Sequence, residues 1–232
     1  LGIEESVAAD LHVQTFADEV KSLLGTVDGE GFEVEIDSAD VKFPAGSMDR
    51  LAQLQEVLGL TEEDASYEIS SEANRHFEGV ALEAMEGAIS GDMTPEDAWE
   101  AIATRRDDLC LKEESMKSLL TSIVMQALGK PLEETLTYAK VNNEQQVYEK
   151  LLDALEAKLA CFAVLQLSGW EDFDESHFFD PTNSNSASGF IDEADRMKMY
   201  QIFLVRSVRN SESGEELTDD MFDEVQEVQS ML

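Results

Sequence analysis

The sequence predicts an all-α fold, and three observations support this class. Apolar residues recur at helical spacing over most of the chain after residue 47. Helix-start signals and glycine stops separate these runs, as at Gly59 and Thr61. The alternation of apolar and polar residues that is typical of strands is confined to one short stretch near residues 27–43.

The first helix is predicted over residues 3–24, because apolar side chains recur near helical spacing and Gly25 follows them. In the next stretch, apolar residues alternate with acids, and Val41 and Phe43 are candidates for a second strand. A short β-hairpin near residues 27–43 and an ordered acidic loop therefore both remain open.

Three helix boundaries can be read from local signals. A helix that starts near Ser47 is expected to end at Gly59, and Thr61 is expected to cap a long helix after it. Thr94 and Pro95 mark another start, because threonine caps well and proline suits the first helical position. The apolar stripe of the helix before Gly59 consists of Met48, Leu51, Leu54, Val57 and Leu58.

The rest of the chain is predicted to be helical over about 112–128, 131–138, 143–167, 192–209 and 218–232. Gly129 and Pro131 are expected to break the chain between the first two of these helices. The strongest stripe belongs to the third helix, with Val147, Leu151, Leu152, Leu155, Leu159, Phe162 and Ala163 facing inward. Cys110 and Cys161 lie in apolar runs, so both are expected to be buried, reduced thiols.

An internal repeat predicts how the helices are arranged. A leucine, a small residue and an aliphatic residue precede an acidic helix start at residues 1–6, 58–63 and 109–114. Stacked helix pairs of this kind form an α-solenoid, so we expect an elongated, HEAT-like helical repeat. Its units are placed at 1–57, 58–108, 109–169 and 170–232 within a single fragment. The simpler alternative is that many helices end and begin with these residue types.

The charge of the chain excludes several function classes. There are 51 Asp and Glu residues against 16 Lys and Arg, which gives a formal charge of −35. A surface this acidic repels phosphate backbones and anionic lipid headgroups, so nucleic-acid binding is not expected. No uncharged apolar run approaches the ~18 residues of a spanning helix, and we expect a soluble fragment of a longer protein.

Two patterns in the sequence resemble cation-binding motifs, but the residues in and around them do not support a cation site. Asp219, Asp220 and Asp223 match an Asp-Asp-x-x-Asp magnesium motif, yet they lie in a tail rich in acids and without a basic cluster. Residues 184–195 have the spacing of a calcium loop, but serines replace the carboxylate ligands. No histidine, serine or cysteine pattern matches a catalytic motif, so no enzyme, cofactor or metal site is predicted.

An aromatic cluster is the candidate partner site. Between Lys158 and Arg196 the chain has acids but no lysine or arginine. The candidate residues are Trp170, Phe173, Phe178 and Phe179, with Asp172, Asp174 and Glu175 as the acidic rim. These aromatics either belong to the core or line a groove that suits an amphipathic, Arg-rich peptide, because large aromatic residues serve both purposes.

Two segments resemble a known family. Residues 59–65 read Gly-Leu-Thr-Glu-Glu-Asp-Ala, and residues 91–96 read Gly-Asp-Met-Thr-Pro-Glu after a long helix that carries His76 and Phe77. This succession is similar to the repeated unit of the large inner-envelope translocon (Tic) scaffold family of chloroplasts. Residues 1–15 resemble a weaker copy, and residues 199–204 are similar to the C-terminal region of that family. The acidic stretch near residue 30 departs from the family and would fit a divergent, algal member.

The resemblance implies a non-enzymatic scaffold on the stromal side of the inner envelope. It implies transit peptides, stromal chaperones and co-chaperones, and other translocon subunits as partners, and membrane attachment only through segments outside this chain. Two alternatives stay open at this stage. The chain can be a generic acidic helical-repeat adaptor, or a helical protein that responds to calcium or another metal.

Overall fold

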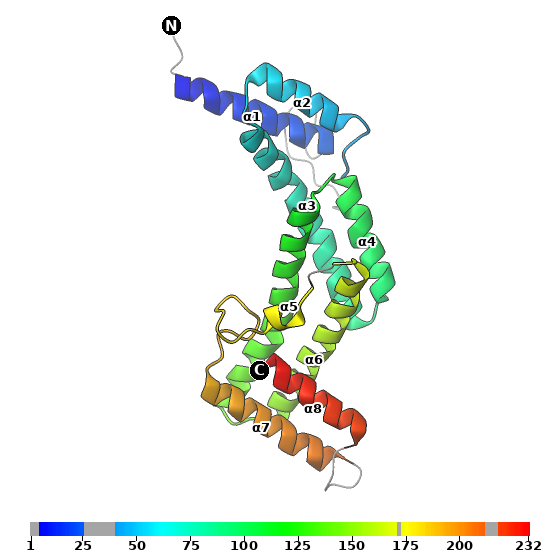
Figure 1. Ribbon diagram of the computed structural model, residues 1–232, viewed down its shortest axis with the longest axis vertical. Helices are drawn as coiled ribbons and strands as arrows, with labels where there is room; N and C mark the ends of the chain where they lie inside the picture. Colours follow the sequence, from blue (N-terminus) through cyan, green and yellow to red (C-terminus); the bar gives the residue numbers. More distant parts are fainter. Residues whose placement is uncertain (1–4, 26–39, 171–172, 212–217) are drawn as a thin grey trace. The chain divides into compact units, whose positions relative to one another are not determined.

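The computed structural model describes residues 5–25, 40–170, 173–211 and 218–232 (Figure 1). These residues form α-helices and one short 3-10 helix but no strand, which confirms the all-α class. The elements are α1 (Glu5–Leu24), α2 (Ser47–Leu58), α3 (Glu62–Ser90), α4 (Pro95–Asp108), α5 (Glu113–Lys140), α6 (Glu144–Leu167), η1 (Glu175–Phe178), α7 (Glu193–Asn210) and α8 (Asp219–Met231).

The chain divides into two compact units. Unit 1 comprises residues 1–84 and 100–120, and unit 2 comprises residues 85–99 and 121–232. The solenoid architecture and its four repeat units stay predictions. Within the described ranges, every helix is too short or too polar to cross a bilayer.

In unit 1, α1 and α2 lie side by side (Figure 1). Phe16 and Val20 of α1 are fully buried, and Leu51 is the buried apolar residue of α2. Gly59 follows α2 in the left-handed conformation, with φ of 66°, which favours glycine at a helix end and confirms the predicted stop. Val57 is 81% exposed, so this member of the predicted apolar stripe does not share the buried side of α2 with Leu51.

Both threonine caps form as predicted. The Thr61 hydroxyl accepts a hydrogen bond from the Asp64 N–H at 3.1 Å, and the Thr94 hydroxyl accepts one from the Asp97 N–H at 3.1 Å. Pro95 is the first residue of α4. These starts were predictable because a cap depends on residues within one turn of each other.

The predicted hairpin is not seen. Residues 27–39 lie outside the described residues, and Val41 and Phe43 belong to no strand. Both side chains are buried in unit 1, where the Phe43 N–H donates to the Asp108 carbonyl at 2.9 Å and the Arg105 guanidinium donates to the Val41 carbonyl. The backbone groups that a neighbouring strand would satisfy are therefore paired with α4 instead.

The predicted break at Gly129 and Pro131 is also wrong, because α5 runs through Pro131 without interruption. A proline removes one backbone donor from a helix and normally disfavours its interior. Here Leu128 and Leu132 are fully buried four residues apart, so one apolar face continues past the proline. Burial of that face outweighs the missing hydrogen bond.

In unit 2, α6, α7 and α8 pack against one another (Figure 1). Leu159 is 57% exposed, so its predicted place in the inward stripe of α6 is wrong. The preceding residue, Lys158, is buried in its place. The buried residues of this three-helix group include Val147, Leu151, Leu155 and Phe162 from α6, Met199 and Phe203 from α7, and Val225 and Val228 from α8.

The two cysteines differ in environment. Cys161 is fully buried, and burial raises the pKa of its thiol to about 12. Cys110 is exposed, which corrects the prediction that both thiols are buried. It lies in the turn after α4 with φ of 50°, and its N–H donates to the Asp107 carbonyl at 3.1 Å. A residue in such a turn points to solvent even when its neighbours along the chain are apolar.

This difference predicts selective labelling. Iodoacetamide should modify Cys110 readily in the folded chain, and Cys161 at least about 100-fold more slowly, because only an accessible thiolate reacts. Timed quenching followed by mass spectrometry of the two peptides measures both rates. In denaturant the two rates should converge, and comparable rates in the native chain would contradict the burial of Cys161.

Candidate functional site

The predicted aromatic residues gather around one side chain of α6, Phe162. Its ring centroid lies 5.3 Å from that of Phe173, 5.3 Å from that of Phe178 and 6.2 Å from that of Phe179. Trp170 extends the group, with its ring centroid 6.1 Å from that of Phe173. The structure therefore brings all four predicted aromatics into one cluster, at the interaction distances that aromatic pairs prefer.

The cluster has a covered part and an accessible part. Phe178 and Phe179 are 3% and 6% exposed, and Phe162 beneath them is also buried. Trp170 and Phe173 are half-buried. Of the four aromatics predicted to contact a partner, only Trp170 and Phe173 offer ring surface to one. Phe178 and Phe179 act as core residues that hold the accessible pair in place.

A buried lysine completes the site. Lys158 precedes Phe162 by one turn of α6, and its Nζ lies 5.8 Å from the centroid of the Phe162 ring and 5.6 Å from that of Phe179. The ammonium pairs with a carboxylate oxygen of Glu227 on α8 and lies 3.7 Å from a carboxylate oxygen of Glu175. It thus ties α6 to both η1 and α8, and both carboxylates remain 47% exposed.

The acidic rim is only partly available. The Asp174 carboxylate caps η1 by accepting a hydrogen bond from the Ser176 N–H at 2.9 Å, and the hydrogen bonds from Ser176 lower the pKa of this carboxyl. Glu175 is paired with Lys158. Asp172 lies outside the described residues. The field of this region is therefore weaker than an uncompensated run of acids would give, because Lys158 neutralises part of it.

In the loop that resembles a calcium site, two of the three serines at the ligand positions bond to backbone carbonyls. Ser186 Oγ donates to the Asp180 carbonyl at 2.6 Å, and Ser188 Oγ donates to the Phe179 carbonyl at 3.2 Å. A Cβ added at Gly189 would lie 1.9 Å from the Asn183 carbonyl oxygen, so only glycine permits this close approach. These contacts fold the loop back onto the aromatic cluster.

Within the described ranges, no three His, Cys, Asp or Glu side chains group in a way that could hold a metal ion. The acids at the start of α8 serve a local purpose. Thr218 caps this helix by accepting from the Met221 N–H at 3.3 Å, and Asp219 and Asp220 lie in its first turn, where the helix dipole favours negative charge.

Sequence reasoning missed Lys158, Glu227 and Ser230, whose hydroxyl lies 3.2 Å from the lysine Nζ. A signal for Lys158 was present, because it falls three residues after Leu155 and four before Phe162 on the inward face of α6. A buried charged residue in that register needs a partner of opposite charge, and the acids of the C-terminal helix are available ones. The pairing itself is a tertiary contact that spacing along the chain does not encode.

No protein-family model matches this sequence, and the comparisons with curated proteins and with solved structures also found no match.

Proposed function

We propose that this chain is part of a non-enzymatic scaffold of chloroplast protein import on the stromal side of the inner envelope. It binds the transit peptides of imported precursors there, and recruits stromal chaperones and co-chaperones beside other translocon subunits. The observation that carries the proposal is the half-buried Trp170–Phe173 pair, which Asp174 and Glu175 follow directly in the chain, in a protein of formal charge −35.

The chemistry of this surface suits a basic targeting peptide. Transit peptides are amphipathic, rich in arginine and serine, and poor in acids. A guanidinium binds favourably over an aromatic face and beside a carboxylate, and Trp170 and Asp174 offer both. Hydrogen bonds from Ser176 lower the pKa of the Asp174 carboxyl and so favour its charged form. The similarity of residues 59–65 and 91–96 to the translocon family supports the cellular setting.

The test is a titration of a fluorescent transit peptide against the chain at about 50 and about 500 mM salt, since screening separates electrostatic from apolar binding. The affinity should fall at high salt, because exposed charges account for part of it. Trp170→Ala should weaken binding about tenfold, as expected for an aromatic anchor. Anisotropy of the labelled peptide measures both effects.

Phe222→Ala is the matched control, because Phe222 is a 51% exposed aromatic that also lies among acids in unit 2. Its affinity should stay within about twofold of that of the parent chain. Absence of binding, or binding that salt does not change, would contradict the proposal. Equal losses from the two substitutions would show that the Trp170 site is not specific.

A further inference from the structure

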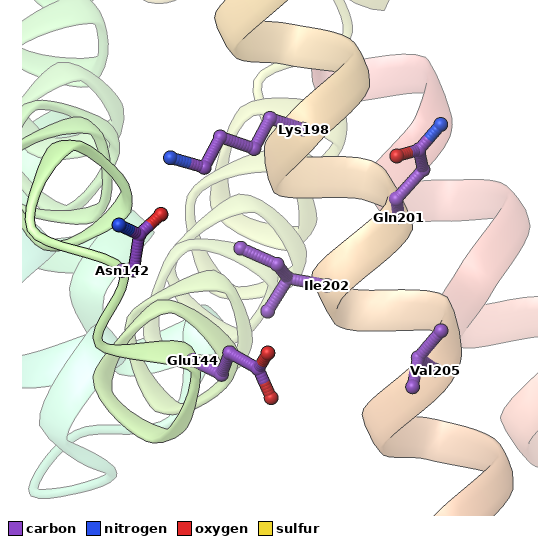
Figure 2. A pocket seen from close by; sticks show the side chains of 6 residues that line it. All are labelled: Asn142, Glu144, Lys198, Gln201, Ile202 and Val205. Carbon is purple, nitrogen blue, oxygen red and sulfur yellow. The ribbon is translucent and has the colours of Figure 1, made fainter.

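A groove lies between α7 and the turn that joins α5 to α6. It has a volume of about 220 Å³ and is lined by Asn142, Glu144, Lys198, Gln201, Ile202 and Val205, here called the α7 groove. Figure 2 shows Lys198 and Ile202 pointing from α7 toward Asn142 and Glu144. All of these residues belong to unit 2. The groove is large enough to accept one apolar side chain of a partner.

The helix that forms one side of the α7 groove is basic in a very acidic chain. Arg196, Lys198, Arg206 and Arg209 all lie on α7 and are four of the 16 Lys and Arg residues, and no acid follows Asp195 in that helix. A carboxylate oxygen of Glu144 lies 3.8 Å from a guanidinium nitrogen of each of two arginines, Arg206 and Arg209. Lys198 and Glu144 line the groove, and Arg206 and Arg209 lie beside it through their contacts with Glu144, so the groove and its edge together carry three cations and the Glu144 carboxylate.

The cations retain capacity for a further carboxylate. Lys198 Nζ donates one hydrogen bond, of 2.6 Å, to the Ala139 carbonyl at the end of α5, and an ammonium carries three protons. The Arg209 side chain is 64% exposed, so its guanidinium faces solvent. A carboxylate that approaches the groove would therefore meet donors without displacing the Glu144 pairs.

Apolar side chains continue the groove along the solvent face of α7. Met197 and Val205 are 54% and 46% exposed, and they lie eight residues apart on one side of the helix with Gln201 between them. Such a stripe is the surface that an amphipathic helix covers when it packs along another helix. By helical spacing, Lys198 and Arg209 lie along one edge of this stripe.

We propose that the α7 groove binds an acidic amphipathic helix of a partner protein. One apolar side chain of that helix enters the groove over Ile202 and Val205, and acids on its edge pair with Lys198 and Arg209. The assignment rests on charge complementarity, because this surface is the reverse in sign of the chain as a whole. It is independent of the transit-peptide site, which takes a basic ligand.

A peptide fits these observations better than a lipid surface does. Stable electrostatic attachment to anionic lipids takes clusters of about 4–8 basic residues. The groove is lined by one lysine and one glutamate, with two arginines beside it, and it is concave. A second copy of this chain would supply acidic helices as well, so self-association is a separate outcome that the experiment must detect.

The experiment titrates the full chain against a fluorescent synthetic helical peptide. Its leucines recur at i, i+3, i+4 and i+7, and glutamates flank them. A second peptide carries glutamine at every glutamate position. The acidic peptide should bind the parent chain at least about tenfold more tightly than the glutamine peptide at low salt, and this difference should shrink as salt rises.

Two substitutions in the groove and two outside it locate the binding. Val205→Asp should lower the affinity for the acidic peptide about tenfold, and Arg209→Glu should lower it about threefold to tenfold. The matched controls are Val57→Asp, at an 81% exposed valine of unit 1, and Lys130→Glu, at an exposed lysine of α5. Each control should stay within about twofold of the parent chain. Circular dichroism checks that every variant remains folded.

Each remaining outcome overturns the proposal. No binding of the acidic peptide, or equal binding of the glutamine peptide, removes the electrostatic argument. Equal losses in the groove and control variants place the peptide elsewhere. Sedimentation of the parent chain alone detects self-association that Val205→Asp abolishes, which would assign the groove to a second copy. Binding to anionic vesicles without peptide binding would assign it to a membrane.

Discussion

Lys158→Glu is expected to lower the free energy of unfolding of unit 2 by about 3–5 kcal/mol, the range found when a buried ion pair is left uncompensated. The lysine side chain is 5% exposed, and its ammonium meets the carboxylates of Glu227 and Glu175 and two aromatic rings. A glutamate there would place a third carboxylate against two others in a water-poor site. The aromatic cluster, η1 and α8 should all loosen together.

Intrinsic fluorescence measures this effect selectively, because the two tryptophans of the chain, Trp99 and Trp170, both belong to unit 2. Urea unfolding followed by fluorescence should therefore shift to lower denaturant concentration, and the slope reports whether the transition stays cooperative. Lys130→Glu is the control for the same charge change at an exposed site, and it should alter stability by no more than about 0.5 kcal/mol.

Lys158→Met separates the charge from the packing of the side chain. Methionine keeps an unbranched apolar stem in the core, and both partner carboxylates are 47% exposed and can turn to water. This variant should therefore lose only about 1 kcal/mol, the net value of a typical intramolecular hydrogen bond, because the partner carboxylates regain water. A loss from Lys158→Glu no larger than that from Lys158→Met would contradict the burial of the ammonium beside these acids.

The elements that the sequence predicts correctly depend on neighbouring residues. Thr61 and Thr94 cap their helices through contacts three residues away, and Gly59 ends α2 through its own backbone conformation. Such effects are complete within one helical turn, so spacing along the chain is sufficient to find them. The all-α class follows from many local signals of this kind.

The misassigned elements depend on distant contacts instead. Val41 and Phe43 read as a strand by alternation, but they pair with α4, and Pro131 reads as a break although Leu128 and Leu132 hold α5 together. At the candidate site, the aromatic residues were found because they cluster in sequence. Lys158 was not found, because the acids that make its burial possible lie on η1 and α8.

Phe203→Ala is expected to lower the free energy of unfolding of unit 2 by about 3–5 kcal/mol, as large-to-small changes of a buried phenylalanine do. Phe203 is fully buried on α7, and its ring stacks on Tyr148 of α6 with a centroid distance of 5.0 Å and an interplanar angle of 26°. Removing the ring leaves a cavity between the two helices. Tryptophan fluorescence during urea unfolding measures the loss.

The size of this loss also bears on the α7 groove, since Glu144 from α6 and Val205 from α7 line it together. If the Phe203–Tyr148 stack holds α7 in register, Phe203→Ala should also weaken binding of the acidic peptide. Phe203→Leu should lower the free energy of unfolding by only about 1–1.5 kcal/mol and leave the affinity for the peptide nearly unchanged. Phe222→Ala, at an exposed ring of α8, is the matched control, with a change within about 0.5 kcal/mol. Equal stability of the Phe203→Ala and Phe222→Ala variants would mean that α7 does not pack on α6 through this ring.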